Sequence, residues 1–426
     1  MTLESEIVIV GAGAAGLWAA GVAARRGRAV LLLEKTARTG TKVLASGGTR
    51  CNLTTTLDAE GAAALFRPRG ARFLRHAFGA LPPRELRERF DALGVPTVDA
   101  PMEKVFPKSD RARDVRDALE REARAAGVRI ELDANVVRVE GGAGAEQPWF
   151  AHIAGGRRAT CTKLLLCPGG MSYPRTGTTG EGYGWLAKLG LPVRPPVPAL
   201  VPLTSPAAWV RELSGIAWQA GEVRLLDPRG KVLGRRRRPL LFTHFGVSGP
   251  AAMDLSVHVA RAQADGEPGE PSELTLALDL LPDVSRADLR GALVEAAAAR
   301  GAPRLSRTLA ADIPKRLLAA ISRAARLAEA DPPVAGIARA HRHDLIETLK
   351  GLRIPIDGTQ GFDRAEVTAG GLALEAVDPR TMAVNGHPGL YVFGELLDLD
   401  GPIGGLNFQA AFACAELAAL DAARLA

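Results

Sequence analysis

The stretch "IVIVGAGAAGLWAA", residues 7–20, joins a continuous apolar run to three glycines spaced as GxGxxG. An apolar, β-branched run that ends in glycine is typical of a buried parallel strand, and the small residues after it favour a helix packed closely on that strand. A second apolar run, "VLLLEK", ends at Glu34 and Lys35. Together they form a βαβ unit of about 30 residues, which predicts a Rossmann-type α/β fold.

The glycines of this unit have separate expected roles. Gly11 permits the tight turn, Gly13 lets the backbone approach a pyrophosphate, and Gly16 lets helix and strand pack closely. The helix N-terminus offers free N–H groups to the diphosphate, and Glu34 accepts hydrogen bonds from ribose hydroxyls. The pattern therefore predicts an adenine dinucleotide. The residues expected to contact it are Gly11, Gly13, Ala14, Ala15, Gly16, Glu34 and Lys35.

The C-terminal stretch "GLYVFGELLDLDGPIGGLNFQAAF" favours FAD over NAD. It reads as a strand, an acidic turn, a glycine cluster and a helix, the return that flavoproteins of the glutathione-reductase type need. Asp398 or Asp400 can bind a ribityl hydroxyl, and Gly404 and Gly405 let a helix begin under the flavin. The positive end of that helix would stabilise an anionic reduced ring. The cofactor contacts expected here are Gly394, Glu395, Asp400, Gly404, Gly405, Asn407 and Phe408.

The composition limits the class of protein. No apolar run approaches the 18 residues of a membrane span, and the N-terminus enters a strand without a signal peptide. Four scattered cysteines without a CxxC pair indicate reduced thiols in a cytoplasm. The tract His341–His343 lacks a ligand framework, so no metal site is predicted. A net charge of +7 permits an anionic partner such as nucleic acid, although coding bias toward arginine explains it as well.

The order of the patterns divides the chain into four expected segments. The proline-rich stretch Leu191–Leu203 should stop regular structure and mark a domain crossing. Strands and a hairpin at residues 223–234 follow. Three helical stretches are then expected at residues 285–300, 304–330 and 334–352, the first capped by Ser285. The expected domains are residues 1–190 for the first FAD-binding part, 191–282 for an inserted β domain, 283–352 for a helical subdomain and 353–426 for the return.

Several blocks together resemble a known family, the BaiN/RdsA-type (YhiN-like) NAD(P)/FAD-dependent oxidoreductases. They include "GAGAAGL", "SGGTRCNLT", "KVFPKSDRARDV", "GGMSYPRTGTTGEGY", "LFTHFGVSGPAAMDLS" and "TAGGLALEAVDPRTM", in order along nearly the whole chain. The resemblance implies a glutathione-reductase-like FAD-binding Rossmann domain interrupted by a β-barrel-like domain with a helical subdomain. The family pattern has a third glycine where Thr49 stands, a change that should be tolerated if the backbone there is not left-handed.

The block Leu44–Thr54 should run from the dinucleotide phosphates toward the flavin ring. Its glycines allow the backbone to lie against the cofactor, and its polar side chains can bind the cofactor. Cys51 is either a reactive thiol with a pKa lowered by Arg50 or a packing residue in contact with flavin, and the absence of a resolving cysteine favours the second. The cofactor contacts expected in and beside this block are Lys42, Gly47, Gly48, Arg50 and Asn52.

Further candidates lie in other blocks. Gly169 and Gly170 should let a strand end approach FAD, and the backbone of Val136 could meet the adenine. Tyr173 could donate a proton and Arg175 could face the substrate, although a tyrosine bridging two loops looks the same.

His244 is a general acid or a structural histidine, and Ser248 should cap the helix that begins near Pro250. The basic loop Arg235–Arg238 either holds RNA phosphates or is solvated.

The resemblance implies flavin-mediated reduction of an activated C=C bond, with NAD(P)H as the electron donor. The family's substrates range from steroid-like enones, which are small molecules, to uracil in ribosomal RNA (rRNA). Some relatives are described instead as amine oxidases that produce hydrogen peroxide. A third hypothesis is a non-catalytic RNA-binding protein that FAD stabilises.

Overall fold

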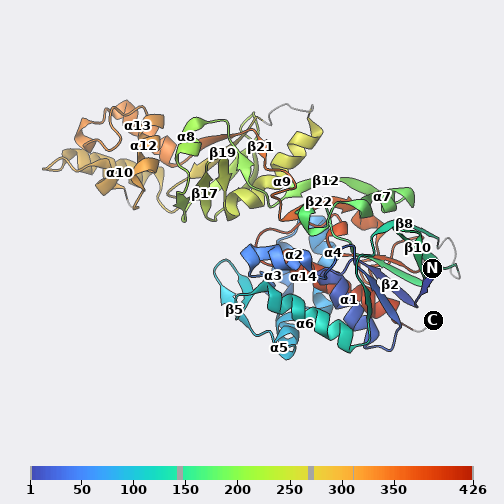
Figure 1. Ribbon diagram of the computed structural model, residues 1–426. Coiled ribbons are helices and arrows are strands. Elements are labelled where there is room, and N and C mark those ends of the chain that lie inside the picture. The colour runs from blue at the N-terminus through green and yellow to red at the C-terminus, as the bar shows by residue number, and fades with distance from the viewer. Residues whose placement is uncertain (1, 142–146, 267–272, 310, 425–426) are drawn as a thin grey trace. The chain divides into compact units, whose positions relative to one another are not determined.

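A computed structural model describes residues 2–141, 147–266, 273–309 and 311–424, which form two compact units (Figure 1). The first unit combines Met1–Val197 with Ala365–Ala426, so the N-terminal and C-terminal segments of the chain fold together. The second unit is the continuous segment Pro198–Arg364. Each unit has a hydrophobic core of its own.

The first unit is built on a five-stranded parallel sheet in the order β23-β11-β2-β3-β7. Its strands are β2 (Ile7–Val10), β3 (Val30–Leu33), β7 (Arg129–Glu131), β11 (Lys163–Leu166) and β23 (Leu390–Val392). All side chains of β2, β3 and β23 are buried, as expected for strands covered on both faces. The predicted Rossmann fold is confirmed, and the C-terminal return supplies an edge strand of the same sheet.

Helices α1 (Ala14–Ala24), α6 (Ala112–Ala125) and α14 (Leu406–Ala422) pack together beside this sheet (Figure 1). Helix α1 is buried on every side. Trp18 of α1 packs against Phe412 of α14, with 5.2 Å between ring centroids, and its Nε1 donates a 2.8 Å hydrogen bond to Glu416. Arg89 completes this buried contact through a 3.0 Å ion pair with Glu416. The first and last helices are therefore joined by both apolar and charged contacts.

The remaining elements of the first unit extend this core. One further sheet has the order β1-β10-β9-β8, and a small sheet has the order β4-β6-β5. The bounds are β1 Thr2–Glu4, α2 Thr41–Ala45, η1 Ser46–Thr49, β4 Thr54–Thr55, α3 Ala59–Ala64, α4 Pro68–Ala80, α5 Pro83–Ala92, β5 Thr97–Ala100, β6 Lys104–Pro107, β8 Val136–Gly141, β9 Trp149–Ile153, β10 Arg157–Cys161, η2 Pro174–Thr176, α7 Glu181–Lys188, β12 Val193–Ala199, β22 Val367–Leu372, η4 Leu374–Ala376 and η5 Gly394–Leu396.

The second unit contains two antiparallel sheets and a group of helices. The sheets have the orders β14-β17-β18-β13-β21 and β16-β15-β19-β20. The bounds are β13 Leu203–Thr204, α8 Ala208–Glu212, β14 Ala217–Trp218, β15 Glu222–Leu226, β16 Val232–Arg236, β17 Leu240–Thr243, β18 Gly246–Ser248, α9 Pro250–Asp265, β19 Leu274–Asp279, α10 Arg286–Ala298, α11 Leu305–Thr308, α12 Lys315–Ala324, η3 Val334–Gly336, α13 Arg339–Leu349, β20 Leu352–Ile356 and β21 Gly358–Thr359.

Two local predictions in the second unit are confirmed. Strands β15 and β16 pair as the expected hairpin. Ser285 caps α10 in a reciprocal box with Asp288, whose backbone N–H donates to the Ser285 hydroxyl at 3.1 Å. Pro250 also begins α9.

Three local predictions are wrong. The proline-rich stretch does not stop regular structure, because residues 193–199 form β12 and pair with β22 in a two-stranded sheet. Such an edge strand tolerates prolines, since it needs ladder hydrogen bonds on one side only. The helix expected over residues 304–330 is split into α11 and α12, with Pro314 at the start of α12. Ser248 does not cap α9, whose N-cap is Gly249.

Candidate functional site

The glycine loop that enters α1 has one open side and two closed ones. A Cβ placed on Gly16 would collide with the carbonyl oxygen of Gly11, and one placed on Gly11 would collide with the backbone of Cys167. A Cβ on Gly13, by contrast, would meet nothing within 4 Å. The protein itself therefore explains why residues 11 and 16 are glycine, while the open space at Gly13 fits the approach of a ligand such as a pyrophosphate.

Two further features of this loop suit a dinucleotide. Helix α1 has no side-chain cap, so its first N–H groups are free to bind an anion. The carboxylate of Glu34 is held in place, because it accepts 2.9 Å hydrogen bonds from the N–H groups of Ala12 and Thr36. Oε1 of Glu34 also accepts a 2.8 Å hydrogen bond from the Thr36 hydroxyl, so it is Oε2 that retains a second lone pair for a ribose hydroxyl. Lys35 points its amine to Thr179, at 2.7 Å, and to Glu181.

The loop after α2 has a left-handed backbone at four residues, Gly47, Gly48, Thr49 and Cys51. Thr49 has φ +71, so the condition under which its replacement of glycine would be harmless is not met. A β-branched residue in this region is strained. The side chain of Asn52 accepts a 3.2 Å hydrogen bond from the N–H of Val105, which fixes the end of the loop to β6. A Cβ on Gly48 would meet nothing within 4 Å, so this side of the loop is open.

Cys51 is not a reactive thiol. Its side chain is fully buried, and burial raises its pKa to about 12, which keeps it protonated at neutral pH. The expected help from Arg50 is absent, because that guanidinium pairs with Asp110 and lies 4.2 Å from the centre of the Phe106 ring. Cys51 is a packing residue of the core.

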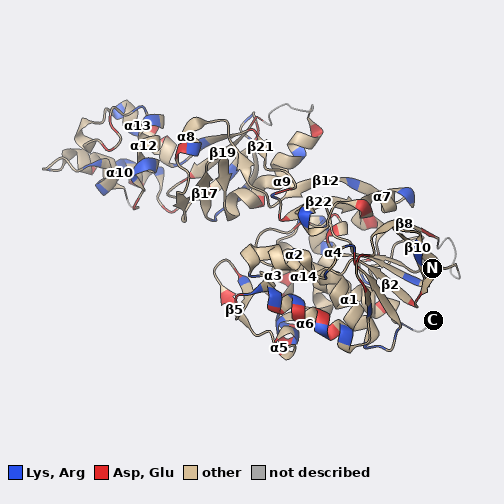
Figure 2. Cartoon of the chain, viewed as in Figure 1, with Lys and Arg blue, Asp and Glu red and all other residues tan. Residues whose placement is uncertain are grey.

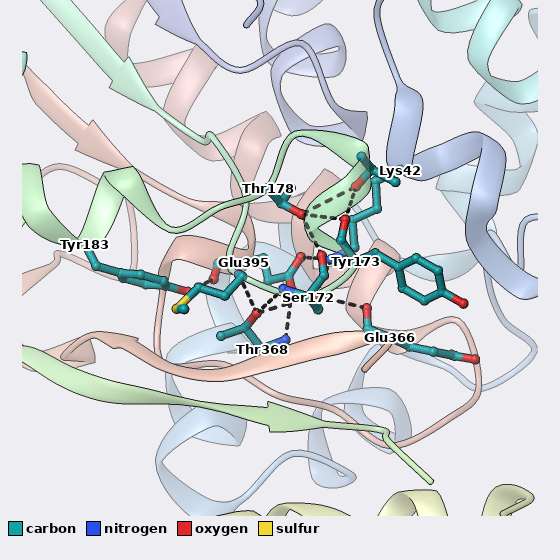
Figure 3. Close-up of polar contacts among 10 residues, drawn as sticks. Lys42, Ser172, Tyr173, Thr178, Tyr183, Glu366, Thr368 and Glu395 are labelled. Carbon is teal, nitrogen blue, oxygen red and sulfur yellow. Dashed lines mark hydrogen bonds and ion pairs between the residues drawn. The ribbon is translucent and has the colours of Figure 1, made fainter. Parts of the chain in front are cut away.

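A partly buried polar network links four distant segments of the first unit (Figure 3). Lys42 donates to Ser172 Oγ at 2.6 Å and forms an ion pair with Glu395. Ser172 Oγ donates to Glu395 at 2.5 Å, and the N–H of Thr368 donates to the same carboxylate at 2.8 Å. Sequence reasoning identified Lys42 and Glu395 but missed Ser172 and Thr368. Both lie in blocks that resemble the family, and their lack of charge gave no further signal.

Tyr173 follows Ser172 and is held in a strained conformation, with φ +54. Its carbonyl oxygen accepts hydrogen bonds from the N–H and the hydroxyl of Thr176, at 2.9 and 2.7 Å. Its ring points away from the network in Figure 3, and its hydroxyl has no hydrogen-bond partner in the part of the chain that the structure describes. Arg175 is exposed. A Cβ on Gly170 would collide with the Thr368 hydroxyl, so contacts within the protein already require glycine at this position.

The acidic turn before α14 is tied to the rest of the unit by charge. Asp400 pairs with Arg67, and burial raises the pKa of this carboxyl to about 6. Asp398 accepts a 3.1 Å hydrogen bond from the N–H of Gly370 and pairs with Arg194 at 3.2 Å. Burial raises the pKa of Asp398 as well. The ribityl candidates are therefore held by neighbouring cations.

Helix α14 begins at Gly405 as predicted, without a side-chain cap. Gly405 has φ +79, and a Cβ on it would collide with the carbonyl group of Thr54. Asn407 uses both ends of its amide to hold Gly401, at 2.9 Å each, so its side chain is committed to the turn. Phe408 stacks on Phe412. Gly404 precedes the helix with φ +146, and Gly394 lies beside Ala15 of α1.

The other sequence candidates have less specific surroundings. Val136 is a buried residue of β8, and a Cβ on Gly169 would collide with the side chain of Thr178. His244 belongs to the second unit, in an exposed turn between β17 and β18.

The expected basic loop Arg235–Arg238 is not a free loop. Arg235 and Arg236 belong to β16. The side chains of Arg236 and Arg238 pair with the buried Asp254, and Arg237 pairs with Asp283.

Two general properties concern residues 2–141, 147–266, 273–309 and 311–424. No helix in these ranges is long and apolar enough to cross a membrane. The same ranges contain no group of three His, Cys, Asp or Glu residues placed to hold a metal ion.

Comparison with known proteins gives matches over almost the whole chain. The family model described as "HI0933-like protein Rossmann domain" matches residues 5–421. The ribosomal RNA dihydrouridine synthase of Escherichia coli K12 is 32% identical over 415 residues, covering 96% of this chain and 97% of that protein. The 3-dehydro-bile acid delta(4,6)-reductase of Clostridium scindens is 31% identical over 422 residues, covering 98% and 99%.

Among solved structures, the 3-ketosteroid delta1-dehydrogenase of Sterolibacterium denitrificans has a TM-score of 0.50 at 14% identity. The match covers 99% of each chain. At this identity the likeness concerns the fold alone.

Proposed function

Because the chain belongs to the HI0933-like Rossmann family and is an FAD-dependent oxidoreductase, we propose that it reduces an activated C=C bond with electrons from NAD(P)H. Dihydrouridine is uridine with two hydrogens added across a C=C bond, and the name of the bile acid relative also denotes reduction of C=C bonds. This shared chemistry, in relatives that match nearly the whole chain, is the observation that carries the proposal.

Within this reaction class, we propose a uridine of rRNA as the substrate. The E. coli relative that acts on rRNA is 32% identical to this chain. The net charge of +7 suits a polyanion better than it suits an apolar steroid. An enone of the bile acid type is the competing substrate, and the experiment below includes it.

The residues of the first unit fit FAD. In this proposal the N–H groups at the start of α1 bind the diphosphate where Gly13 leaves open space, and Glu34 accepts the ribose hydroxyls. Asp400 accepts a ribityl hydroxyl, and the uncapped N-terminus of α14 faces the ring. When bound, FAD supplies the hydride that the substrate carbon receives.

Tyr173 is the proposed proton donor to the neighbouring substrate carbon. Its hydroxyl has no partner among the described residues, and its strained backbone is fixed by Thr176. The network of Lys42, Glu395 and Ser172 positions Tyr173, because Ser172 is its chain neighbour. Arg175 is proposed to orient the substrate. The buried Cys51 is proposed to have a packing role and no catalytic one.

The experiment is an anaerobic reduction followed by reoxidation. NADH or NADPH should bleach the flavin absorbance, and an rRNA transcript should restore it with formation of dihydrouridine, detected by mass spectrometry. A 3-oxo-4,6-diene steroid serves as the competing substrate. Tyr173→Phe should lower the rate of reoxidation by roughly 100-fold or more while flavin reduction stays unchanged.

Failure of both nicotinamide nucleotides to bleach the flavin would refute the reductase. Reoxidation by oxygen, with amines as the only reductants, would favour the amine oxidase instead.

A further inference from the structure

Helix α4 presents a face that is charged with one sign only. It buries Gly70, Phe73, Leu74, Ala77 and Phe78 and exposes Arg69, Arg72, Arg75 and His76. These four residues lie at spacings of three or one, so they share one side of the helix. The helix contains no Asp or Glu. Its solvent side is therefore a basic stripe.

The neighbouring amphipathic helices differ in this respect. Helix α6 holds four arginines and four acidic residues, and Figure 2 shows the two colours alternating along it. Helix α5 holds three of each. Several of their arginines pair with acids of the same helix, as Arg124 does with Glu120 and Arg84 with Glu88. An arginine-rich composition alone does not explain α4, because the same composition gives balanced faces elsewhere.

The arginines of α4 are uncommitted. No hydrogen bond or ion pair within 4 Å holds Arg69, Arg72 or Arg75 in the described ranges, and Arg69 interacts only at longer range with Glu375. This sets them apart from Arg236 and Arg238, which both pair with the buried Asp254. Exposed guanidinium groups without partners can bind an anion without first breaking a contact.

The stripe begins next to the proposed flavin site. Arg67, the N-cap of α4, pairs with Asp400 in the acidic turn before α14. Helix α4 also packs against α14, whose N-terminus is proposed to face the flavin ring.

We propose that Arg69, Arg72 and Arg75 bind the phosphodiester backbone of the RNA substrate beside the target uridine, an inference that rests on the proposed function. A helix rises 1.5 Å per residue, so these arginines span about 9 Å, enough for two or three successive phosphates of one strand. In this proposal the arginines contact phosphates irrespective of the sequence of the RNA, and recognition of the uracil base is left to the flavin site.

The test uses the FAD-loaded, full-length protein and a fluorescein-labelled single-stranded RNA of the rRNA sequence. The variant Arg69→Gln/Arg72→Gln/Arg75→Gln is compared with Arg111→Gln/Arg121→Gln/Arg124→Gln, which removes the same charge from exposed positions beside or on α6. Glutamine keeps helix propensity. Circular dichroism and flavin absorbance report that both variants fold and hold FAD.

The stripe predicts a specific salt dependence. Each lost phosphate contact lowers the slope of log K against log salt by about 0.7, so the α4 variant should lose about 2 units of slope. The same relation gives a roughly 100-fold weaker RNA affinity at about 0.1 M salt. The α6 variant should change the affinity by less than about threefold. Reduction of the flavin by NAD(P)H should be unchanged in both.

An equal loss of RNA affinity in the two variants, or no loss of affinity in the α4 variant, would overturn the inference. Binding of the stripe to phosphatidylglycerol vesicles in preference to RNA would overturn it as well. The proposed function can fail separately. If the wild-type protein binds RNA through α4 but forms no dihydrouridine, the RNA-binding surface is supported and the proposed reaction is refuted. If both variants form dihydrouridine with wild-type kcat/KM, the proposed reaction is supported and the RNA-binding surface is refuted.

Discussion

The N-termini of α1 and α14 both begin at a glycine, lack a side-chain cap and lead into largely buried helices, yet they are built differently. The entrance of α1 is closed by contacts between backbone atoms at Gly11 and Gly16, and its Gly13 faces open space. The entrance of α14 is pressed against Thr54 and follows a turn held by the Arg67–Asp400 ion pair. A binding site formed by neighbouring backbone groups can be predicted from a local sequence pattern, whereas a site that depends on segments distant in sequence cannot.

The largest expected effect comes from closing the α1 loop. Gly16→Ala places a Cβ against the Gly11 carbonyl and should lower the free energy of unfolding by about 3 kcal/mol or more, with loss of FAD. Gly13→Ala is the matched control, because its Cβ meets no protein atom. It should change the stability of the FAD-free protein by no more than about 0.5 kcal/mol but weaken FAD binding. Urea unfolding and FAD titration measure both quantities.

An unchanged FAD affinity in Gly13→Ala would show that the open side of the loop is not the phosphate site. Equal destabilisation by the two substitutions would remove the distinction between open and closed sides.

Gly405→Ala tests the other entrance. It adds a collision with Thr54 to the cost of a positive φ, so the free energy of unfolding should fall by about 2 to 3 kcal/mol. Gly27→Ala has the same φ of +79 and open surroundings, and should cost only about 1 kcal/mol. If the two substitutions cost the same in thermal unfolding, α14 is not pressed on Thr54, and the two helix entrances are alike.

The charged turn before α14 predicts a pH dependence that the α1 loop lacks. The pKa of Asp400 is raised by burial from 3.8 to about 6, so the folded protein holds this proton more tightly than the unfolded chain. The stability from this group is present below pH 4 and is lost as the pH rises through 6. In the FAD-free protein, the free energy of unfolding should fall by on the order of 3 kcal/mol across this window, and Asp400→Asn should abolish that fall. Urea unfolding between these pH values would show parallel curves for both proteins if Arg67 fully compensates the burial.

The smallest expected effect on stability concerns the loop after α2, which contains Gly47, Gly48 and Thr49. Thr49→Gly should relieve the left-handed strain and raise the free energy of unfolding by about 0.5 to 1 kcal/mol, after the entropic cost of glycine. Thr49→Ala keeps a Cβ and should therefore raise the free energy of unfolding by less. A destabilised Thr49→Gly protein in chemical denaturation would mean that the threonine side chain has a compensating contact.

The parts of the molecule that could be predicted depend on neighbours in sequence. The spacing of Gly11, Gly13 and Gly16 dictates a strand, a turn and a helix, so the sheet and its first helix followed from the residues. The meeting of Lys42 with Glu395 depends on segments about 350 residues apart, and only the fold brings them together. Ser172 and Thr368 lie in blocks that resemble the family, but they carry no charge that would mark them among their neighbours.

Two errors have the same physical origin. Local rules predicted that prolines end structure at residues 191–203, but β12 needs a partner on one edge only and finds it in β22. The basic run at residues 235–238 was expected to be a loop that holds RNA phosphates or is solvated, but Arg236 and Arg238 both pair with Asp254, which lies on another element. In both cases a partner distant in sequence decided the outcome.

The division of the chain between its units sets an order of events during synthesis. Pro198–Arg364 is continuous and can fold as soon as it leaves the ribosome, whereas the flavin unit lacks an edge strand and a core helix until residues 390–422 have followed. The apolar surface of α1 that packs against α14 therefore stays uncovered while the inserted unit is made. We therefore expect FAD to bind only after residues 390–422 have been made, so that a shortage of FAD shows first as degradation of newly made chains.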